Sequence, residues 1–340
     1  MLQAVKMKKE VLDTIFAEFS NANVLIIGDV MLDSYTAGTV SRISPEAPVP
    51  VVDISARYNR LGGAANVALN IKALGAKPIL CSVIGNDRQS QNFAKLMENE
   101  GLTTLGILPS DERILTVKHR IIGNKQQLLR IDEEITRPLS AEDEMRFLSL
   151  LEQIIDQNSI NVLIFEDYDK GVITPRIINE IVTISKSKNI PITVDPKKVN
   201  FLHYNNAAIF KPNLNELKAG CQLADGEISE ADLKEIIKRF MLEKQHQRLL
   251  LTLSDKGVLM CENQENNFIF EHIPAYVRNI ADVSGAGDTV ISVASLCLSI
   301  GMEIKDIAFF SNLAGGLVCE EVGVAAINKE KFTSEIVKLL

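Results

Sequence analysis

The chain has 340 residues, of which 46% are hydrophobic, so it can bury a large core and is not expected to be disordered. Its 44 acidic and 36 basic side chains give a net charge of −8, which argues against nucleic acid or an anionic membrane as a general partner. The five cysteines form no CxxC pair, and no apolar run approaches the roughly 20 residues of a membrane span. We therefore expect a cytoplasmic protein without structural zinc.

After a first helix, short apolar runs of the kind that form strands buried on both faces recur along the chain. Helical periodicity separates most of them, and they lie at 24–27, 78–85, 161–165, 190–195, 208–210 and 248–253. This alternation predicts a three-layer α/β/α fold with a mostly parallel central sheet, whose ligands bind beyond the carboxyl ends of the strands. No repeat or long linker interrupts the sequence, so residues 1–340 are expected to form a single domain.

Two stretches break this pattern, at about residues 34–60 and 113–133. In the second, the segments 114–120 and 126–131 flank Gly123-Asn124, which predicts a β-hairpin. Together the two stretches are expected to form a small β-sheet that projects from the main body and serves as a lid. Such a sheet would expose apolar side chains, so we also expect it to pair across a two-fold axis in a homodimer.

The sharpest motif is Ser284-Gly285-Ala286-Gly287-Asp288, which precedes an apolar helix with Gly301 as its stop signal. Small residues let the backbone approach a ligand closely, and the free N–H groups of a first helical turn form an anion site. Asp288 stands within that anion site. As a simple cap it would stabilise the helix by about 1 kcal/mol, whereas beside a transferring phosphoryl group it would accept the proton of the nucleophile.

This motif resembles the C-terminal signature of the ribokinase-like (PfkB) carbohydrate kinases, and further elements of that family follow in the expected order over nearly the whole chain. The resemblance implies a ribokinase-like fold, ATP and Mg²⁺ as cofactors, and Asp288 as the catalytic base. It also implies that the amides of Gly285, Ala286 and Gly287 stabilise charge on the phosphoryl oxygens.

Two N-terminal segments resemble the sugar pocket of this family. Asp33 closes the segment 28–33, and Gly62, Gly63 and Asn66 match the glycine pair and the asparagine. Paired glycines let main-chain amides reach a sugar, while Asp33 and Asn66 supply oriented acceptors and donors. The glycine pair alone would also fit a simple turn, and Asp29 would also fit a mere strand end.

Other segments resemble the nucleotide side of the family. Asn213 and Glu216 match the Asn-x-x-Glu element that helps to hold hydrated magnesium, although the same pair would also fit a capping box. The segment 319–323 departs from the Gly-Lys-x-Gly that relatives often have, which leaves the adenine side and any monovalent-cation site open. The remaining residues expected near the nucleotide are Asp195, Lys197, Thr252, Ser254, Gly257 and Asn312.

The segments 41–50, 126–132 and 166–172 look closer to one branch of the family, the heptose-phosphate kinases of lipopolysaccharide inner-core synthesis. That resemblance implies phosphorylation of D-glycero-D-manno-heptose 7-phosphate at its anomeric hydroxyl, with Asp167 among the substrate ligands. The phosphate of this substrate requires cations, and arginine binds phosphate through a bidentate fork. The candidates are Arg42, Arg120, Arg130, Lys170 and Lys197.

Three alternatives remain. The same chemistry could act on another sugar, such as fructose 6-phosphate, ribose or a nucleoside. A non-catalytic sugar-binding protein should have a damaged Gly-Ala-Gly-Asp motif, which is intact here, and a dinucleotide-binding oxidoreductase should have Gly-x-Gly-x-x-Gly where this chain has Gly28-Asp29-Val30-Met31.

Many relatives also carry an adenylyltransferase-type domain with a His-x-Gly-His motif, whereas the four histidines here are isolated. We therefore expect a stand-alone kinase that works with a separate adenylyltransferase.

Overall fold

The apolar runs of the sequence form the middle of a nine-stranded sheet with the order β13-β12-β11-β10-β9-β8-β1-β4-β5. The computed structural model describes residues 2–224, 226–276 and 278–339. The predicted strands are confirmed as β1 (Asn23–Gly28), β4 (Lys77–Gly85), β8 (Val162–Glu166), β9 (Ile192–Asp195), β10 (Ile209–Phe210) and β11 (Arg248–Thr252). Parallel pairing continues to the edge strand β5 (Gly106–Ser110), whereas β12 (Val258–Gln264) and β13 (Asn267–Ile273) form an antiparallel extension at the other edge.

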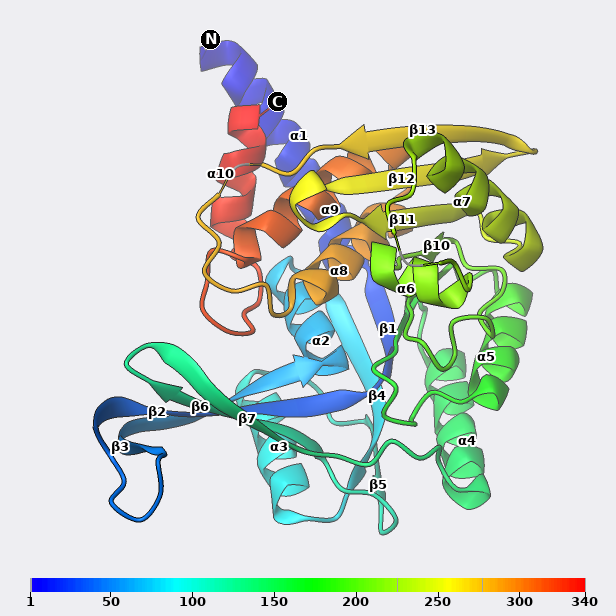
Figure 1. The fold of residues 1–340 in the computed structure, drawn as a ribbon. Coiled ribbons are helices and arrows are strands. Elements are labelled where there is room, and N and C mark those ends of the chain that lie inside the picture. Colours follow the sequence, from blue (N-terminus) through cyan, green and yellow to red (C-terminus); the bar gives the residue numbers. More distant parts are fainter. Residues whose placement is uncertain (1, 225, 277, 340) are drawn as a thin grey trace.

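Both faces of this sheet are covered by helices, which confirms the three-layer α/β/α architecture (Figure 1). In β1, for example, Val24 and Ile26 enter one hydrophobic core while Leu25 and Ile27 enter the other. The first core is covered by α1 (Leu2–Asn21), α2 (Ala64–Ala73), α3 (Arg88–Asn99), α8 (Ala286–Ser299), α9 (Ile304–Val318) and α10 (Lys329–Leu339). The second is covered by α4 (Ala141–Gln157), α5 (Pro175–Ser187), α6 (Leu214–Gly220) and α7 (Glu230–Lys244).

The two stretches that break the α/β pattern form a second sheet with the order β3-β2-β6-β7, called the projecting sheet below (Figure 1). Its strands are β2 (Val30–Ile43), β3 (Pro50–Gly63), β6 (Thr116–Gly123) and β7 (Gln126–Glu133). The predicted hairpin is confirmed, because β6 and β7 pair antiparallel around Asn124 and Lys125, whose φ angles of 52° and 67° suit a two-residue hairpin turn. The role of this sheet as a lid stays a prediction.

Strand β1 marks the point where the order of the large sheet reverses. From β1 the chain runs to β4 and β5 on one side, and then returns to build β8, β9, β10 and β11 on the other. Ligands of such sheets bind beyond the carboxyl ends of the strands at this point. Asp29, Glu166 and Asp195 follow or end β1, β8 and β9, so this edge of the sheet is where a site is expected.

None of the helices within the described ranges combines the length and the apolar character needed to cross a membrane.

Candidate active site

Asp288 lies in the first turn of α8 and is held by side chains from two other elements. Its Oδ2 accepts a hydrogen bond from Nδ2 of Asn66 at 2.7 Å, and its Oδ1 accepts one from the hydroxyl of Tyr168 at 2.6 Å. The side chain is only 3% exposed, and this burial raises the pKa of Asp288 while the two donors lower it. The N-cap position of α8 belongs to Gly285 and has no side-chain cap. Asp288 therefore does not serve as a conventional helix cap.

The backbone before Asp288 requires small residues and leaves amides free. Gly285 has φ 81°, and a Cβ atom there would lie 2.8 Å from Nδ2 of Asn66, so a larger residue would push Asn66 from the carboxylate. The amide of Ala286 donates to the carbonyl of Val283 at 3.3 Å. Among the described residues, the amides of Gly285 and Gly287 have no hydrogen-bond partner. Free amides at a helix N-terminus can bind an anion.

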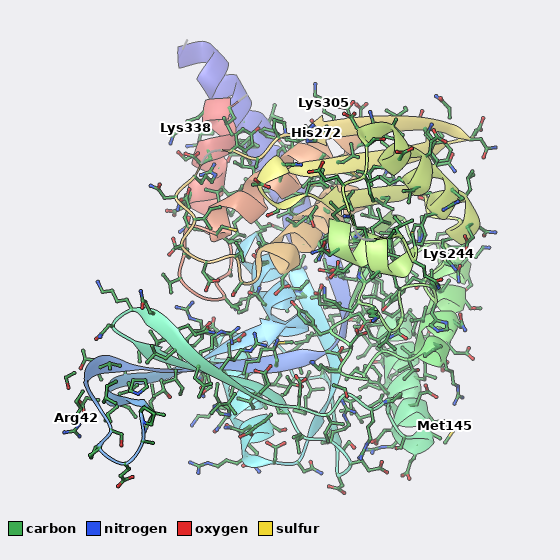
Figure 2. All side chains as sticks on the ribbon, in the orientation of Figure 1. Arg42, Met145, Lys244, His272, Lys305 and Lys338 are labelled. Atoms are coloured by element: carbon green, nitrogen blue, oxygen red, sulfur yellow. The ribbon has the colours of Figure 1, made fainter. Side chains whose placement is uncertain are left out.

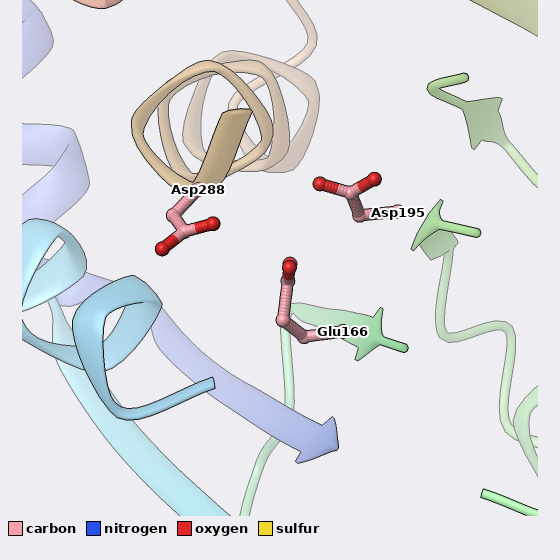
Figure 3. Close-up of side chains that lie close together, drawn as sticks. All are labelled: Glu166, Asp195 and Asp288. Carbon is pink, nitrogen blue, oxygen red and sulfur yellow. The ribbon is translucent and has the colours of Figure 1, made fainter. Parts of the chain in front are cut away.

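Three carboxylates converge beneath this helix (Figure 3). Glu166, Asp195 and Asp288 each offer an oxygen within 4.8 Å of the others. Glu166 is fully buried, and neither of its oxygens has a hydrogen-bond partner in the part of the chain that the structure describes. Burial, together with the carboxylates of Asp195 and Asp288, raises the pKa of Glu166 well above its ordinary value. Because a buried carboxylate is costly unless it is paired, and Mg²⁺ prefers oxygen ligands, this cluster fits a divalent cation.

Two lysines stand beside the carboxylates. The ammonium of Lys211 lies 2.8 Å from Oδ2 of Asp195, and both side chains are buried. Lys197 Nζ lies 2.7 Å from Glu216 Oε1 and 3.7 Å from Asp195 Oδ1. A Cβ atom on Gly287 would lie 3.5 Å from Nζ of Lys211, so Lys211 stands against the first turn of α8. These cations offset part of the negative charge and can meet the phosphates of a nucleotide.

Asn213 and Glu216 form the capping box that their spacing allowed. Oδ1 of Asn213 accepts from the amide of Glu216 at 2.9 Å, and Oε2 of Glu216 accepts from the amide of Asn213 at 2.8 Å. The pair thus begins α6, while the other oxygen of Glu216 is free to accept from Lys197. Lys197 therefore links this element to Asp195 and the three-carboxylate cluster.

The other residues expected near the nucleotide end β11, follow it, or lie on α9. Thr252 forms an isolated parallel β-bridge with Asn213. Ser254 and Gly257 lie in the turn that leads to β12, and their φ angles are 57° and 86°. Gly257 is needed for packing, because a Cβ atom there would lie 2.1 Å from the carbonyl oxygen of Ile273. Asn312 donates its side-chain amide to the carbonyl of Pro274 at 2.9 Å.

The predicted sugar-side residues lie together beside Asp288. Asp33 is buried on β2. Gly62 lies on the neighbouring strand β3, where an added Cβ atom would lie 2.3 Å from Oδ2 of Asp33. Gly63, with φ 60°, is the N-cap of α2, the helix that carries Asn66. The glycine pair therefore does more than form a turn, because Gly62 leaves space beside Asp33 and Gly63 leaves space beside the carbonyl of Asp29.

The face of the projecting sheet that carries Asp33 also carries cations. Arg120 Nη1 lies 2.5 Å from Oδ1 of Asp33, and Arg130 lies directly opposite Arg120 in the register of β6 and β7. Arg130 is exposed on β7 and pairs with Asp132 at 2.9 Å. Lys118 has no salt-bridge partner within the described residues, and its ammonium lies 6.0 Å from the ring centre of Tyr168. Burial lowers the pKa of Lys118.

The remaining sequence candidates have partners elsewhere. Nζ of Lys170 lies 2.9 Å from Glu134, and the carboxylate of Asp167 accepts from Asn200 and Tyr204 at 3.0 Å and 2.8 Å. Burial, with the carboxylate of Asp29 as the second cause, raises the pKa of Asp167 to about 7. Arg42 lies at the outer end of the projecting sheet, away from the carboxylates (Figure 2).

Sequence analysis did not single out Glu166, Tyr168, Lys118 or Lys211 as functional residues. Glu166 stands at the end of a predicted strand, which is a signal that could have identified it. No sequence signal places Tyr168 on Asp288, because the two residues are 120 positions apart and meet only in the folded chain.

Residues 21–331 match the pfkB family of carbohydrate kinases. The curated relatives include the bifunctional protein HldE of Geobacter metallireducens, 33% identical over 95% of this chain and 64% of the relative. The protein of the same name from Pelobacter propionicus is 36% identical over 94% of this chain and 64% of the relative. The chain thus spans less than two thirds of the length of these two relatives.

Solved structures share the fold at low sequence identity. Phosphofructokinase-2 from Escherichia coli in complex with fructose-6-phosphate has a TM-score of 0.74 and 17% identity, over 94% of this chain and 99% of that chain. Ribokinase from Arabidopsis thaliana with ribose and ATP has a TM-score of 0.68 and 14% identity, over 93% of this chain and 98% of that chain. The predicted ribokinase-like fold is confirmed.

Proposed function

Because the chain belongs to the pfkB family of carbohydrate kinases, we propose that it transfers the γ-phosphate of ATP to the anomeric hydroxyl of D-glycero-β-D-manno-heptose 7-phosphate. The observation that carries the phosphotransfer is the buried Asp288, held by Asn66 and Tyr168 between the sugar-side residues and the cluster with Glu166 and Asp195. The relatives named HldE and the three heptose-kinase-like sequence segments support the choice of sugar.

In this reaction Asp288 is the base. The anomeric oxygen attacks the γ-phosphorus, the bond from that phosphorus to ADP breaks, and Asp288 takes the proton of the hydroxyl. The free amides of Gly285 and Gly287 point to the binding of a phosphoryl oxygen, joined by Ala286 if its long bond to Val283 opens. Asp33 and Asn66 hold the sugar so that its hydroxyl reaches the base.

We propose Glu166 and Asp195 as the residues that hold Mg²⁺, because no group in the described part of the chain forms a hydrogen bond to the carboxylate of Glu166, whose charge is offset in part by Lys211 and Lys197. When bound, Mg²⁺ offsets the negative charge of the phosphates. Asn213 and Glu216 would act on the metal site indirectly, through the contact of Glu216 with Lys197. Thr252, Ser254, Gly257 and Asn312 remain proposed neighbours of the nucleotide.

The substrate's own phosphate would bind to the cationic face of the projecting sheet. Arg120 and Arg130 are direct cross-strand neighbours. Asp33 and Asp132 pair with them, but a guanidinium has five N–H donors and can also bind a phosphate. Lys118 adds an ammonium without a carboxylate partner among the described residues. A phosphate here would bridge all three cations. Lys170 is a weaker candidate because its ammonium already pairs with Glu134. Asp167 is weaker because its carboxylate already accepts from Asn200 and Tyr204.

The test is an ADP-release assay over D-glycero-D-manno-heptose 7-phosphate, the same heptose without its phosphate, fructose 6-phosphate, ribose and a nucleoside. We expect the highest kcat/KM with heptose 7-phosphate, and the product to be identified as the 1,7-bisphosphate by ³¹P NMR. A clear preference for fructose 6-phosphate or for an unphosphorylated sugar would reject the proposed substrate while leaving the kinase chemistry in place.

A further inference from the structure

The hydroxyl of Tyr168 donates to Oδ1 of Asp288, one of the two atoms to which an incoming hydroxyl could donate. With Asn66 on Oδ2, each oxygen of the carboxylate already has a donor, and only 3% of the side chain is exposed. Neither a sugar hydroxyl nor a water molecule therefore has much access to the carboxylate of Asp288 while Tyr168 stays in place. The phenol stands where the acceptor hydroxyl is needed.

The backbone that carries Tyr168 is fixed by two buried charged groups. The carboxylate of Asp29 accepts from the amides of Tyr168, Lys170 and Val172 at 2.9 Å, 3.0 Å and 3.0 Å. Arg113 donates to the carbonyl of Lys170 from the other side. Since the main chain is tied at these points, a rotation of the Tyr168 side chain is the simplest movement that would free Oδ1.

Two lysines from different parts of the chain lie near the ring of Tyr168. Nζ of Lys118, from the projecting sheet, is 6.0 Å from the ring centre, and Nζ of Lys197, which contacts Glu216, is 5.3 Å from it. Both ammonium groups lie within the range of a cation–π interaction. These contacts hold the ring by its face and do not depend on its hydroxyl.

We propose that Tyr168 determines acceptor specificity by excluding water: its hydroxyl covers Asp288 until a sugar bound by Asp33 and Asn66 displaces it. Without this cover, a water oxygen would attack the γ-phosphorus, the bond to ADP would break, and Asp288 would take a proton from the water, giving ADP and inorganic phosphate. A sugar has binding energy to displace the phenol, whereas a single water has none. The inference rests on Asp288 as the base of the proposed function, but not on heptose as the sugar.

Tyr168→Phe tests this directly, because it removes the hydroxyl and keeps the ring near the two lysines. With MgATP and no sugar, we expect the rate of phosphate release to rise by about 10-fold or more as water reaches Asp288. The kcat for phosphorylation of the best sugar should change much less. An unchanged or lower rate of ATP hydrolysis in a folded Tyr168→Phe protein would overturn the proposal.

Tyr204→Phe is the matched control. It also removes a buried phenolic hydroxyl bonded to a carboxylate at 2.8 Å, but that carboxylate belongs to Asp167. Its sugar-independent hydrolysis should equal that of the wild type, and an equal rise in both variants would reject a specific role for Tyr168.

The double variant Tyr168→Phe/Asp288→Asn separates this inference from the proposed function. If Asp288 is the base, the gain in hydrolysis disappears in the double variant. A gain that persists shows that another group activates water, which contradicts Asp288 as the base and with it the covering role of Tyr168. Loss of the heptose preference alone would leave the inference intact.

Discussion

The α/β body contributes a cluster of buried carboxylates to the site, with Lys197 and Lys211 beside it, whereas the projecting sheet contributes cations and the carboxylate of Asp33. The body supplies Glu166, Asp195 and Asp288, which are buried at strand ends and at the start of a helix. The projecting sheet supplies cations on its strands, led by Lys118 and Arg120. Carboxylates suit a metal ion and proton transfer, which every acceptor needs, whereas cations suit an acceptor that is itself charged. In the proposed function, the body would therefore determine the chemistry and the projecting sheet would select the substrate.

The largest effect is expected from Asp288→Asn, which changes the chemistry of the body alone. The amide oxygen can still accept from Asn66, and its NH₂ group can donate to the oxygen of Tyr168, so the melting temperature should barely change. Without the basic carboxylate, kcat should fall by roughly 10²- to 10⁴-fold on every sugar. ATP affinity, measured by calorimetry, should be unchanged or higher because a negative charge near the phosphates is removed.

Asp306→Asn is the control for this variant. Asp306 is in the same position of the next helix, the third residue of α9, but is exposed. Its kcat should equal that of the wild type. If Asp288→Asn also retained most of its kcat, the assignment of the base would be wrong.

A smaller loss is expected from Glu166→Gln, which tests whether the unpaired carboxylate is a metal ligand. Activity at low Mg²⁺ should fall by about 10- to 100-fold and recover in part at high Mg²⁺. Stability should be equal or higher, because an unpaired buried charge is removed. Activity measured over a Mg²⁺ titration and a thermal melt check both outcomes, and an unchanged Mg²⁺ requirement would contradict the assignment.

Asp29→Asn provides the contrast, since Asp29 follows the neighbouring strand β1 and is also buried, but accepts from three backbone amides. Its replacement orphans at least one buried amide, at about 1–3 kcal/mol. We expect a lower melting temperature with the same Mg²⁺ requirement. A shifted Mg²⁺ requirement in Asp29→Asn would show that the metal effect of Glu166→Gln is indirect.

Local features of this site could be predicted from the sequence, whereas contacts between distant elements could not. The strand ends, the hairpin and the residues around Asp33 and Asp288 were predictable, because hydrophobic periodicity and short motifs act over neighbouring residues. The contacts of Tyr168 with Asp288 and of Lys118 with Tyr168 were not, since they join elements that are distant in the chain. Sequence likewise could not show that Asp167 turns to Tyr204, away from Asp288, although it stands next to Tyr168.

Lys118→Met tests the selective role of the projecting sheet. Because one charge-assisted hydrogen bond contributes about 1.5–3 kcal/mol, kcat/KM for heptose 7-phosphate should fall by about 10-fold or more. The value for the unphosphorylated heptose should change little. Arg42→Met, which removes a cation at the outer end of the same sheet (Figure 2), is the control and should leave both values unchanged. Equal losses on the two sugars would show that the phosphate binds elsewhere.

The smallest effect on turnover is expected from the other face of the projecting sheet, which we predict to form a homodimer. Side chains alternate along β7, so Leu129 and Ile131 lie opposite in face to Arg130, and they are 54% and 49% exposed. Ile121 lies directly across from Leu129, which extends the apolar area onto β6. Covering such a face with a second copy would remove it from water.

Light scattering should give the mass of a dimer, and Leu129→Lys/Ile131→Lys should give a monomer with nearly unchanged kcat. Leu242→Lys, which charges an exposed leucine on α7, should remain dimeric. A fully active wild-type monomer at assay concentrations would contradict the predicted dimer. The division of chemistry and substrate selection between the body and the projecting sheet would then be a property of each single chain.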